Sequence, residues 1–193
     1  MQSVIWLNTI GELKAKGDKM KITEHFTKEE LIYSETAIRY KISNEPPLVH
    51  EGTLKHTCQY LLEPLRALLN TKYVGKVING KTVKKVILNT TSAYRSSALN
   101  EKLAKLGKHP AKNSQHCTGE AWDGEVILVF TDNSRMVLDY KQFFKDIKNF
   151  VAQGSLSVDQ CIQETDGSDK WVHISYSILG STRNRKQFFE INL

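Results

Sequence analysis

A histidine and a carboxylate lie close together in the segment Ser114–Asp123, which reads Ser-Gln-His-Cys-Thr-Gly-Glu-Ala-Trp-Asp. His116 and Asp123 are separated there by a glycine and small residues, just before a strand-like stretch. A second histidine, His173, follows Trp171 in another strand-like stretch. Two neutral imidazoles and one carboxylate form an ordinary ligand set for a catalytic zinc ion and leave a fourth position for water. Most single histidines in proteins bind no metal. By residue type alone, these residues could therefore equally well form a metal site or be ordinary packed side chains.

The segments around these residues resemble the motifs of a known family. The pattern Ser-x-His-x-x-Gly-x-Ala-x-Asp is complete within Ser114–Asp123, and Trp171-Val-His173 resembles the segment that carries the last histidine. Ser92–Asn100 is similar to Ser-Gly-Tyr-Arg-Ser-x-x-Leu-Asn, and Asp159–Glu164 is similar to the strand before that histidine. Together they resemble the M15 family of zinc D-alanyl-D-alanine peptidases, which includes carboxypeptidases, dipeptidases and phage endolysins. The resemblance covers about residues 20–176 and points to a phage-related subgroup.

The resemblance implies that His116, Asp123 and His173 bind Zn²⁺. It also draws attention to Arg95, which stands among Ser, Tyr and Asn after a predicted strand. A guanidinium can bind the terminal carboxylate of a peptide in two-pronged fashion, or it can steady a developing oxyanion. We therefore expect Arg95 to belong to the same site, since loops after strands often carry functional residues.

The general base departs from the best-known family pattern. That pattern has an acid three positions before the last histidine, and Lys170 occupies this position here. Glu164 and Asp169 are the acids that can take its place. We favour Glu164, because the strand that it ends is expected to form a hairpin with the strand of His173.

The predicted function is zinc-dependent hydrolysis of a peptide bond in a peptidoglycan stem peptide or another short D-alanine-ended peptide. D-Ala-D-Ala carboxypeptidases and cell-wall endopeptidases share these ligands, so the position of cleavage stays open. The alternative is a non-catalytic, zinc-stabilised module that binds a peptide or the cell wall. Lys170 favours this alternative, whereas the coincidence of Arg95 with a full ligand set favours the peptidase.

Length and composition agree with one globular domain. The chain has 193 residues, of which 40% are hydrophobic and 25% charged. Its formal net charge is +6, but the lysines and arginines are scattered among acids, so we expect no nucleic-acid partner. No apolar run approaches the roughly eighteen residues that span a bilayer, so we expect no membrane insertion. A monomer is expected.

The cysteines and the N-terminal sequence indicate in which cellular compartment the protein is made. Cys58, Cys117 and Cys161 form no Cys-x-x-Cys unit, so reduced thiols are expected. Met1–Lys19 lacks the features of a signal peptide, and Met20 begins a stretch typical of a domain start. We therefore predict an upstream extension over residues 1–19, a peptidase domain over residues 20–193, and synthesis in the cytoplasm. Release through a holin would bring such a protein to the cell wall.

The site must be positioned by helices and strands, and their predicted order indicates an α+β domain, because helices come first and strands cluster later. A capping box at Thr27-Lys-Glu-Glu30 predicts a short helix, and Asn79-Gly80 predicts a hairpin. Further helices are expected over residues 49–70, 98–106 and 140–151, and strands over residues 86–89, 121–130, 160–164, 170–176 and 187–191. The family resemblance implies an antiparallel sheet packed with helices, in a fold like that of hedgehog domains and D-Ala-D-Ala peptidases.

Overall fold

The computed structural model of the protein describes residues 20–192, so the predicted extension over residues 1–19 lies outside the described residues. The helix start at Thr27 is confirmed, because its hydroxyl accepts a hydrogen bond from the backbone N–H of Glu30 (3.4 Å) at the start of α2 (Lys28–Ile32), and the Glu30 carboxylate contacts the same hydroxyl (2.9 Å). The helix ends at Ile32, and the side chain of Ser34 caps a second short helix, α3 (Glu35–Arg39).

The long predicted helix is continuous and slightly longer than expected. It comprises α4 (Leu48–Thr57), a π-helical turn η1 (Cys58–Leu62) and α5 (Glu63–Tyr73). The apolar residues that predicted the helix form its core face, each at most 1% exposed: Leu54, Cys58, Leu61, Leu62, Leu65 and Leu69. Among residues 20–192, none of the helices has the length and apolar character that a bilayer crossing demands.

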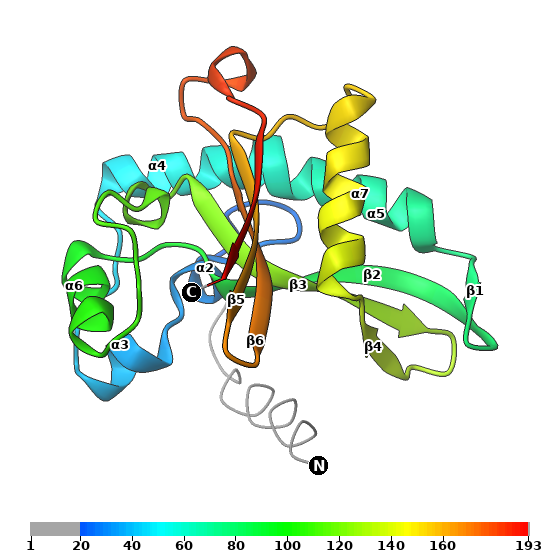
Figure 1. Ribbon diagram of the computed structural model, residues 1–193, viewed down its shortest axis with the longest axis horizontal. Helices are drawn as coiled ribbons and strands as arrows, with labels where there is room; N and C mark the ends of the chain where they lie inside the picture. Colours follow the sequence, from blue (N-terminus) through cyan, green and yellow to red (C-terminus); the bar gives the residue numbers. More distant parts are fainter. Residues whose placement is uncertain (1–19, 193) are drawn as a thin grey trace.

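Seven strands form one curled sheet in the order β1-β2-β3-β6-β5-β7, with β4 paired to β3 beside this path (Figure 1). The strands are β1 (Val77–Ile78), β2 (Lys81–Ser92), β3 (Ala121–Phe130), β4 (Arg135–Val137), β5 (Gln160–Asp166), β6 (Asp169–Ser175) and β7 (Gln187–Asn192). The predicted hairpin joins β1 to β2 through Asn79 and Gly80, which both have positive φ angles (51° and 76°).

The expectation of a wholly antiparallel sheet is wrong at its edge. β7 runs parallel to β5, with Gln187 opposite Gln160, so the sheet is mixed. β6 ends beside the start of β5, and the connection after it, which includes the short helix η3 (Ser181–Arg183), stays at that end of the sheet and passes to the far side of β5. β7 therefore begins level with the start of β5 and runs in the same direction, whereas a tight turn after β6 would have produced an antiparallel neighbour of β6.

One face of the sheet is covered by helices and the other carries polar side chains. The amphipathic helix α7 (Tyr140–Ala152) lies beside α5 over the sheet (Figure 1), and the Tyr73 hydroxyl donates to Asp146 between the two helices (2.5 Å). On β3, Trp122 packs edge-to-face against Phe143 of α7. Because successive strand residues alternate between faces, Asp123 points to the opposite side. The sheet therefore separates the helix-packed core from the side that carries the predicted site.

Candidate metal centre

Asp123 and His173 come together through strand pairing. Asp123 on β3 lies directly opposite His173 on the antiparallel strand β6. Side chains of such a cross-strand pair point to the same face of a sheet. Asp123 Oδ1 lies 2.8 Å from His173 Nδ1, and both residues are buried. Register alone therefore brings these two predicted ligands into contact, although fifty positions separate them in the chain.

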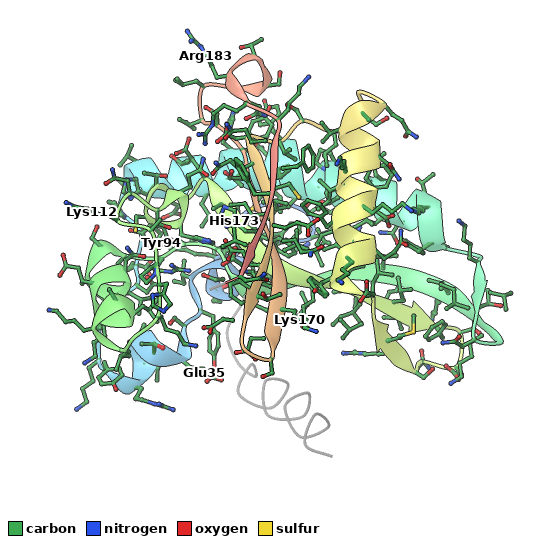
Figure 2. The ribbon with its side chains drawn as sticks, in the orientation of Figure 1. Glu35, Tyr94, Lys112, Lys170, His173 and Arg183 are labelled. Carbon is green, nitrogen blue, oxygen red and sulfur yellow. The ribbon has the colours of Figure 1, made fainter. Side chains whose placement is uncertain are left out.

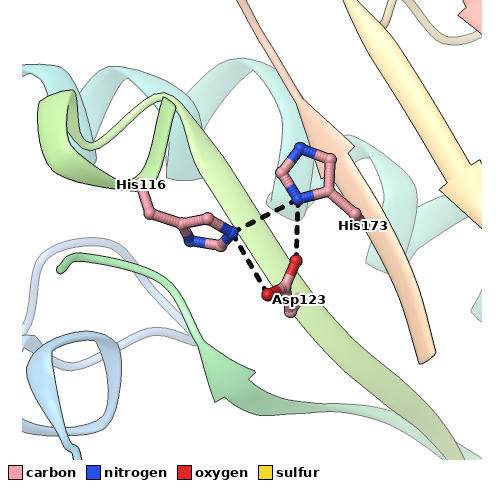
Figure 3. Close-up of side chains that lie close together, drawn as sticks. All are labelled: His116, Asp123 and His173. Carbon is pink, nitrogen blue, oxygen red and sulfur yellow. Dashed lines mark hydrogen bonds and ion pairs between the residues drawn. The ribbon is translucent and has the colours of Figure 1, made fainter. Parts of the chain in front are cut away.

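His116 reaches the same point from a short 3₁₀ helix, η2 (Gln115–Thr118), that directly precedes β3. Its Nδ1 lies 2.7 Å from the backbone oxygen of Ala93, which follows β2. In the neutral imidazole this contact is an N–H donated to a carbonyl, so the lone pair on Nε2 points away from Ala93. Nε2 lies 3.2 Å from His173 Nδ1 and 3.1 Å from Asp123 Oδ2 (Figure 3).

Gly119 makes the path from η2 into β3 possible. Its φ angle is +79°, which side-chain-bearing residues rarely adopt. A Cβ at this position would also lie 2.9 Å from the backbone oxygen of His50 in α4. The carbonyl of Gly119 accepts a hydrogen bond from the hydroxyl of Thr57 (2.8 Å), so the turn is held against the long helix. The glycine of the sequence motif is thus required by both conformation and space.

The donor atoms of the three residues suit a small cation. One ligand atom from each of His116, Asp123 and His173 lies within 4.8 Å of the others. Zinc ligands about 2.0–2.1 Å from the metal in a tetrahedron are about 3.3 Å apart, close to the 3.2 Å between the two imidazole nitrogens. His116 Nε2 and Asp123 Oδ2 are both acceptors when His116 is neutral, and a cation satisfies both. The group can therefore hold a metal ion.

The charges of His116 and Asp123 agree with this conclusion, whereas His173 must lose its proton when a metal binds. Burial lowers the pKa of His116 and so favours its neutral, metal-binding form. Burial by itself would raise the pKa of Asp123, but His116 and His173 hold it below its ordinary value, so the carboxylate stays ionised. Burial likewise opposes the charge on His173, but its hydrogen bond to Asp123 raises its pKa. One buried negative charge thus faces two imidazoles.

Arg95 lies at the edge of the group, as the sequence predicted. Its Nη2 is 3.9 Å from Asp123 Oδ2 and donates to the Ser92 hydroxyl (3.3 Å), while Nη1 donates to Asn100 Oδ1 (3.2 Å). Its backbone N–H donates to the carbonyl of His116 (3.1 Å). Arg95 therefore connects the segment after β2 to the segment of the first ligand, and its side chain is held by neighbours on both sides.

Glu164 shares the face of the metal group. It lies on β5 opposite Trp171, which is two residues before His173 on β6. Diagonal neighbours of this kind are about 7–8 Å apart at Cα, within reach of a long side chain. Burial and then the charge of Asp123 raise the pKa of Glu164, and a raised pKa suits a carboxylate that exchanges protons near neutral pH.

Asp169 and Lys170 lie farther from the ligands. Asp169 is exposed at the start of β6, four residues or about 13 Å along the strand from His173. Lys170 lies near the hairpin turn, away from the central position of His173 (Figure 2). Its Nζ is 5.6 Å from the ring centre of Tyr140, the first residue of α7, on the other face of the sheet. Of the two predicted acids, Glu164 is the nearer to the metal group.

A cavity of about 1060 Å³ opens onto these residues. It is lined by the three candidate ligands and by Arg95, Glu164 and Trp171. Lys108 and His109 of the segment before η2 and Asp166 and Asp169 at the β5–β6 turn also line it, and the ion pair between Lys108 and Asp166 (3.2 Å) joins these two segments. The volume is sufficient for a short peptide, since pockets for small ligands measure about 300–1,000 Å³.

The sequence patterns did not reveal the groups that orient the side chains of the site. Asn100 was part of the family-like segment, and only its contact with Arg95 shows what it does. Ala93 acts through its backbone carbonyl, which no side-chain pattern could indicate. The other histidines lie outside the metal group, although His109 lines the cavity: His25, His50, His56 and His109. The three cysteines are free, as expected.

Comparison of the chain with protein-family models, with curated proteins and with solved structures found no match.

Proposed function

We propose that this chain is a zinc-dependent peptidase of the M15 type, with a fold like that of hedgehog domains and D-Ala-D-Ala peptidases. Its substrate is a short peptide of the peptidoglycan type that ends in D-alanine. The observation that carries the proposal is the convergence of His116, Asp123 and His173 in a cavity that also contains Glu164 and Arg95. A metal-ligand set, a carboxylate with a raised pKa and a partly buried guanidinium are the components that metal-assisted peptide hydrolysis requires.

Zinc is the proposed metal because of the donor types. Two imidazoles and one carboxylate suit zinc, whereas magnesium and calcium prefer oxygen ligands. Three protein ligands also leave a position for water or substrate, which is typical of catalytic rather than structural zinc sites. A bound zinc ion supplies Lewis acidity, which makes water a stronger nucleophile and polarises a substrate carbonyl.

Glu164 performs the proton transfers. Its carboxylate accepts a proton from the attacking water and returns that proton to the leaving amine. The raised pKa of Glu164 brings the group closer to working pH, so that both its protonated and its ionised forms are accessible during turnover. Trp171, opposite Glu164 on β6, forms part of the apolar lining beside it.

Arg95 orients the peptide. Its guanidinium binds the terminal carboxylate of the substrate or steadies the oxyanion that develops at the scissile carbonyl. The contacts of Arg95 with Asn100 and Ser92 pre-organise the guanidinium, which reduces the entropy lost when substrate binds.

The proposal is tested by incubating the zinc-loaded protein with a peptide ending in D-Ala-D-Ala, with the same peptide ending in L-Ala-L-Ala, and with purified sacculi. We expect release of D-alanine from the first peptide, or new amino termini in the sacculi, and no product from the L-Ala control. Products are identified by mass spectrometry. A zinc-loaded protein that cleaves none of these substrates would contradict the peptidase proposal.

A non-catalytic zinc-stabilised module that binds a peptide or the cell wall is the second candidate. It is favoured by one observation: the position that carries an acid in the best-known family pattern is Lys170, whose Nζ lies over Tyr140. Retention of the protein on sacculi without any released product, and loss of that retention on zinc removal, would support this candidate instead.

A further inference from the structure

Asp159, directly before β5, is a buried carboxylate that the proposed chemistry does not use. Only 3% of the residue is exposed. Its two oxygens accept hydrogen bonds from the side chain of Gln115 (Nε2, 2.9 Å) and from Arg185 through its backbone N–H (3.0 Å), Nε (2.8 Å) and Nη2 (2.5 Å). Two parallel contacts from a guanidinium make a directional, charge-assisted pair. This pair fixes the Asp159 carboxylate in one orientation.

Gln115 connects this carboxylate to the first metal ligand. It is the first residue of η2 and directly precedes His116. Its side chain donates to Asp159, while its backbone oxygen accepts hydrogen bonds from the Thr118 hydroxyl (3.0 Å) and from the backbone N–H of Glu120 (3.0 Å). Gln115 therefore ties the whole turn that carries His116 to the beginning of β5.

The backbone of Asp159 also contacts the segment of the third ligand. Its N–H donates to the carbonyl of Ser175 (2.7 Å), two residues after His173 on β6. Its carbonyl accepts from the backbone N–H of Gln187, the first residue of β7 (3.0 Å). One residue thus joins η2, β6 and the C-terminal strand.

We propose that Asp159 and Arg185 are positioning residues of the metal centre, which act through Gln115 to hold His116 at ligand distance from His173. The physical reason is that η2 is a short 3₁₀ helix, a weak element that needs outside contacts to keep one geometry. Outer partners of metal ligands typically change metal affinity by about 10- to 100-fold when they are removed. The inference rests on the metal-binding part of the proposed function and does not require hydrolysis.

The test compares Gln115→Ala with Gln142→Ala. Gln142 also donates to a buried carboxylate, Asp146 (2.6 Å), but that carboxylate keeps Tyr73 and Lys72 as partners and lies among α5 and α7. Zinc affinity is measured by competition with a chromophoric chelator, in variants whose fold is checked by circular dichroism. We expect zinc to bind about 10-fold more weakly to the Gln115→Ala variant and unchanged to the Gln142→Ala variant. Equal losses in both variants would overturn the proposal.

Arg185 provides a second variant that should fold, because half of its side chain is exposed (51%). We expect Arg185→Ala to weaken zinc binding about as much as Gln115→Ala, and Arg185→Lys to restore part of the affinity, because lysine keeps the charge but not the paired contacts. Wild-type affinity in Arg185→Ala would overturn the role assigned to the pair.

Amide hydrogen exchange of the metal-free protein separates this inference from the proposed function. The amides of Cys117, Gly119 and Glu120 donate within the η2 turn. We expect them to exchange faster in Gln115→Ala and in Arg185→Ala than in wild type, with unchanged exchange at Leu138, whose amide donates to Val126 on β3. If the wild type binds no zinc, the metal proposal fails. Amide hydrogen exchange in the η2 turn still tests whether Asp159 and Arg185 position that turn. Unchanged exchange in both variants would overturn that role.

Discussion

Asp123 and His173 are direct cross-strand partners on β3 and β6, and their side chains meet at 2.8 Å on the face of the sheet opposite the helices. His116 completes the group from η2, the 3₁₀ helix just before β3 (Figure 3). Two ligands therefore depend on strand register and the third on a short turn. A one-residue slip of β6 would carry His173 to the other face and remove the site.

Metal binding should depend on each of the three candidate ligands. We expect His116→Ala, Asp123→Ala and His173→Ala to lower the bound zinc from about one ion per chain to background, because two remaining ligands do not complete a catalytic site. The zinc content after dialysis is measured by inductively coupled plasma mass spectrometry. His25→Ala is the control, since His25 pairs with Glu63 outside the group and its loss should leave zinc unchanged. Full zinc in any of the ligand variants would exclude that residue from the site.

Glu164→Gln should separate metal binding from turnover. The amide cannot accept the proton of the attacking water, so we expect a fall in kcat of about 10²- to 10⁴-fold with zinc content unchanged. Asp169→Asn is the matched variant, and its exposed position about 13 Å along β6 from His173 predicts a small effect. The reverse ranking of the two variants would transfer the role of base to Asp169.

Arg95→Ala should affect peptides with a free C-terminal carboxylate more than amidated ones. Hydrogen bonds to charged groups contribute about 1.5–3 kcal/mol, so we expect kcat/KM for the free peptide to fall about 10- to 100-fold. The same peptide with an amidated C-terminus should lose little. Lys112→Ala removes an exposed cation outside the cavity lining and serves as the control. Equal losses on both peptides would assign Arg95 to the oxyanion rather than to the terminal carboxylate.

Gly119→Ala should destabilise the protein and weaken the metal site together. The positive φ angle and the 2.9 Å approach of a Cβ to the His50 oxygen both oppose a side chain, and we expect a loss of about 1–3 kcal/mol of unfolding free energy. Gly154→Ala is the matched control, because Gly154 also has a positive φ (+72°) but nothing lies within 4 Å of the Cβ that alanine would add there. Urea unfolding measures the difference. If Gly119→Ala lowers the unfolding free energy no more than Gly154→Ala does, the turn accommodates the added methyl group.

The Asp159–Arg185 pair predicts a pH dependence of stability. Hydrogen bonds from Arg185 lower the pKa of Asp159 to about 2 in the folded protein, against about 3.9 in an unfolded chain. A depressed pKa contributes stability above the unfolded value, and that contribution disappears as the pH falls toward the folded value. We expect Asp159→Asn to be less stable than wild type at pH 7, with a difference that narrows between about pH 4 and pH 2. Urea midpoints over this range measure it, and a difference that stays constant would contradict the assignment.

The sequence by itself determined most of the elements and the identity of the candidate ligands. Apolar spacing predicted the long helix and α7, and the strand over residues 121–130 is confirmed with the predicted bounds. Local chemistry was sufficient for these because a capping hydroxyl, an Asn-Gly turn or a helical stripe acts over a few residues. The resemblance of the segment around His116 and Asp123 to a family motif also singled out the candidate ligands, which residue types alone had left open.

Only the tertiary structure decided how these residues meet. The parallel direction of β7, the pairing of Asp123 with His173 and the contact of His116 with the Ala93 carbonyl all join segments distant in the chain. The same is true of the position of Glu164 beside the ligands, since it depends on the register of β5 against β6. Register and crossover direction are set by the summed packing of the whole sheet, so no local pattern around His116, Asp123 or His173 could have contained them.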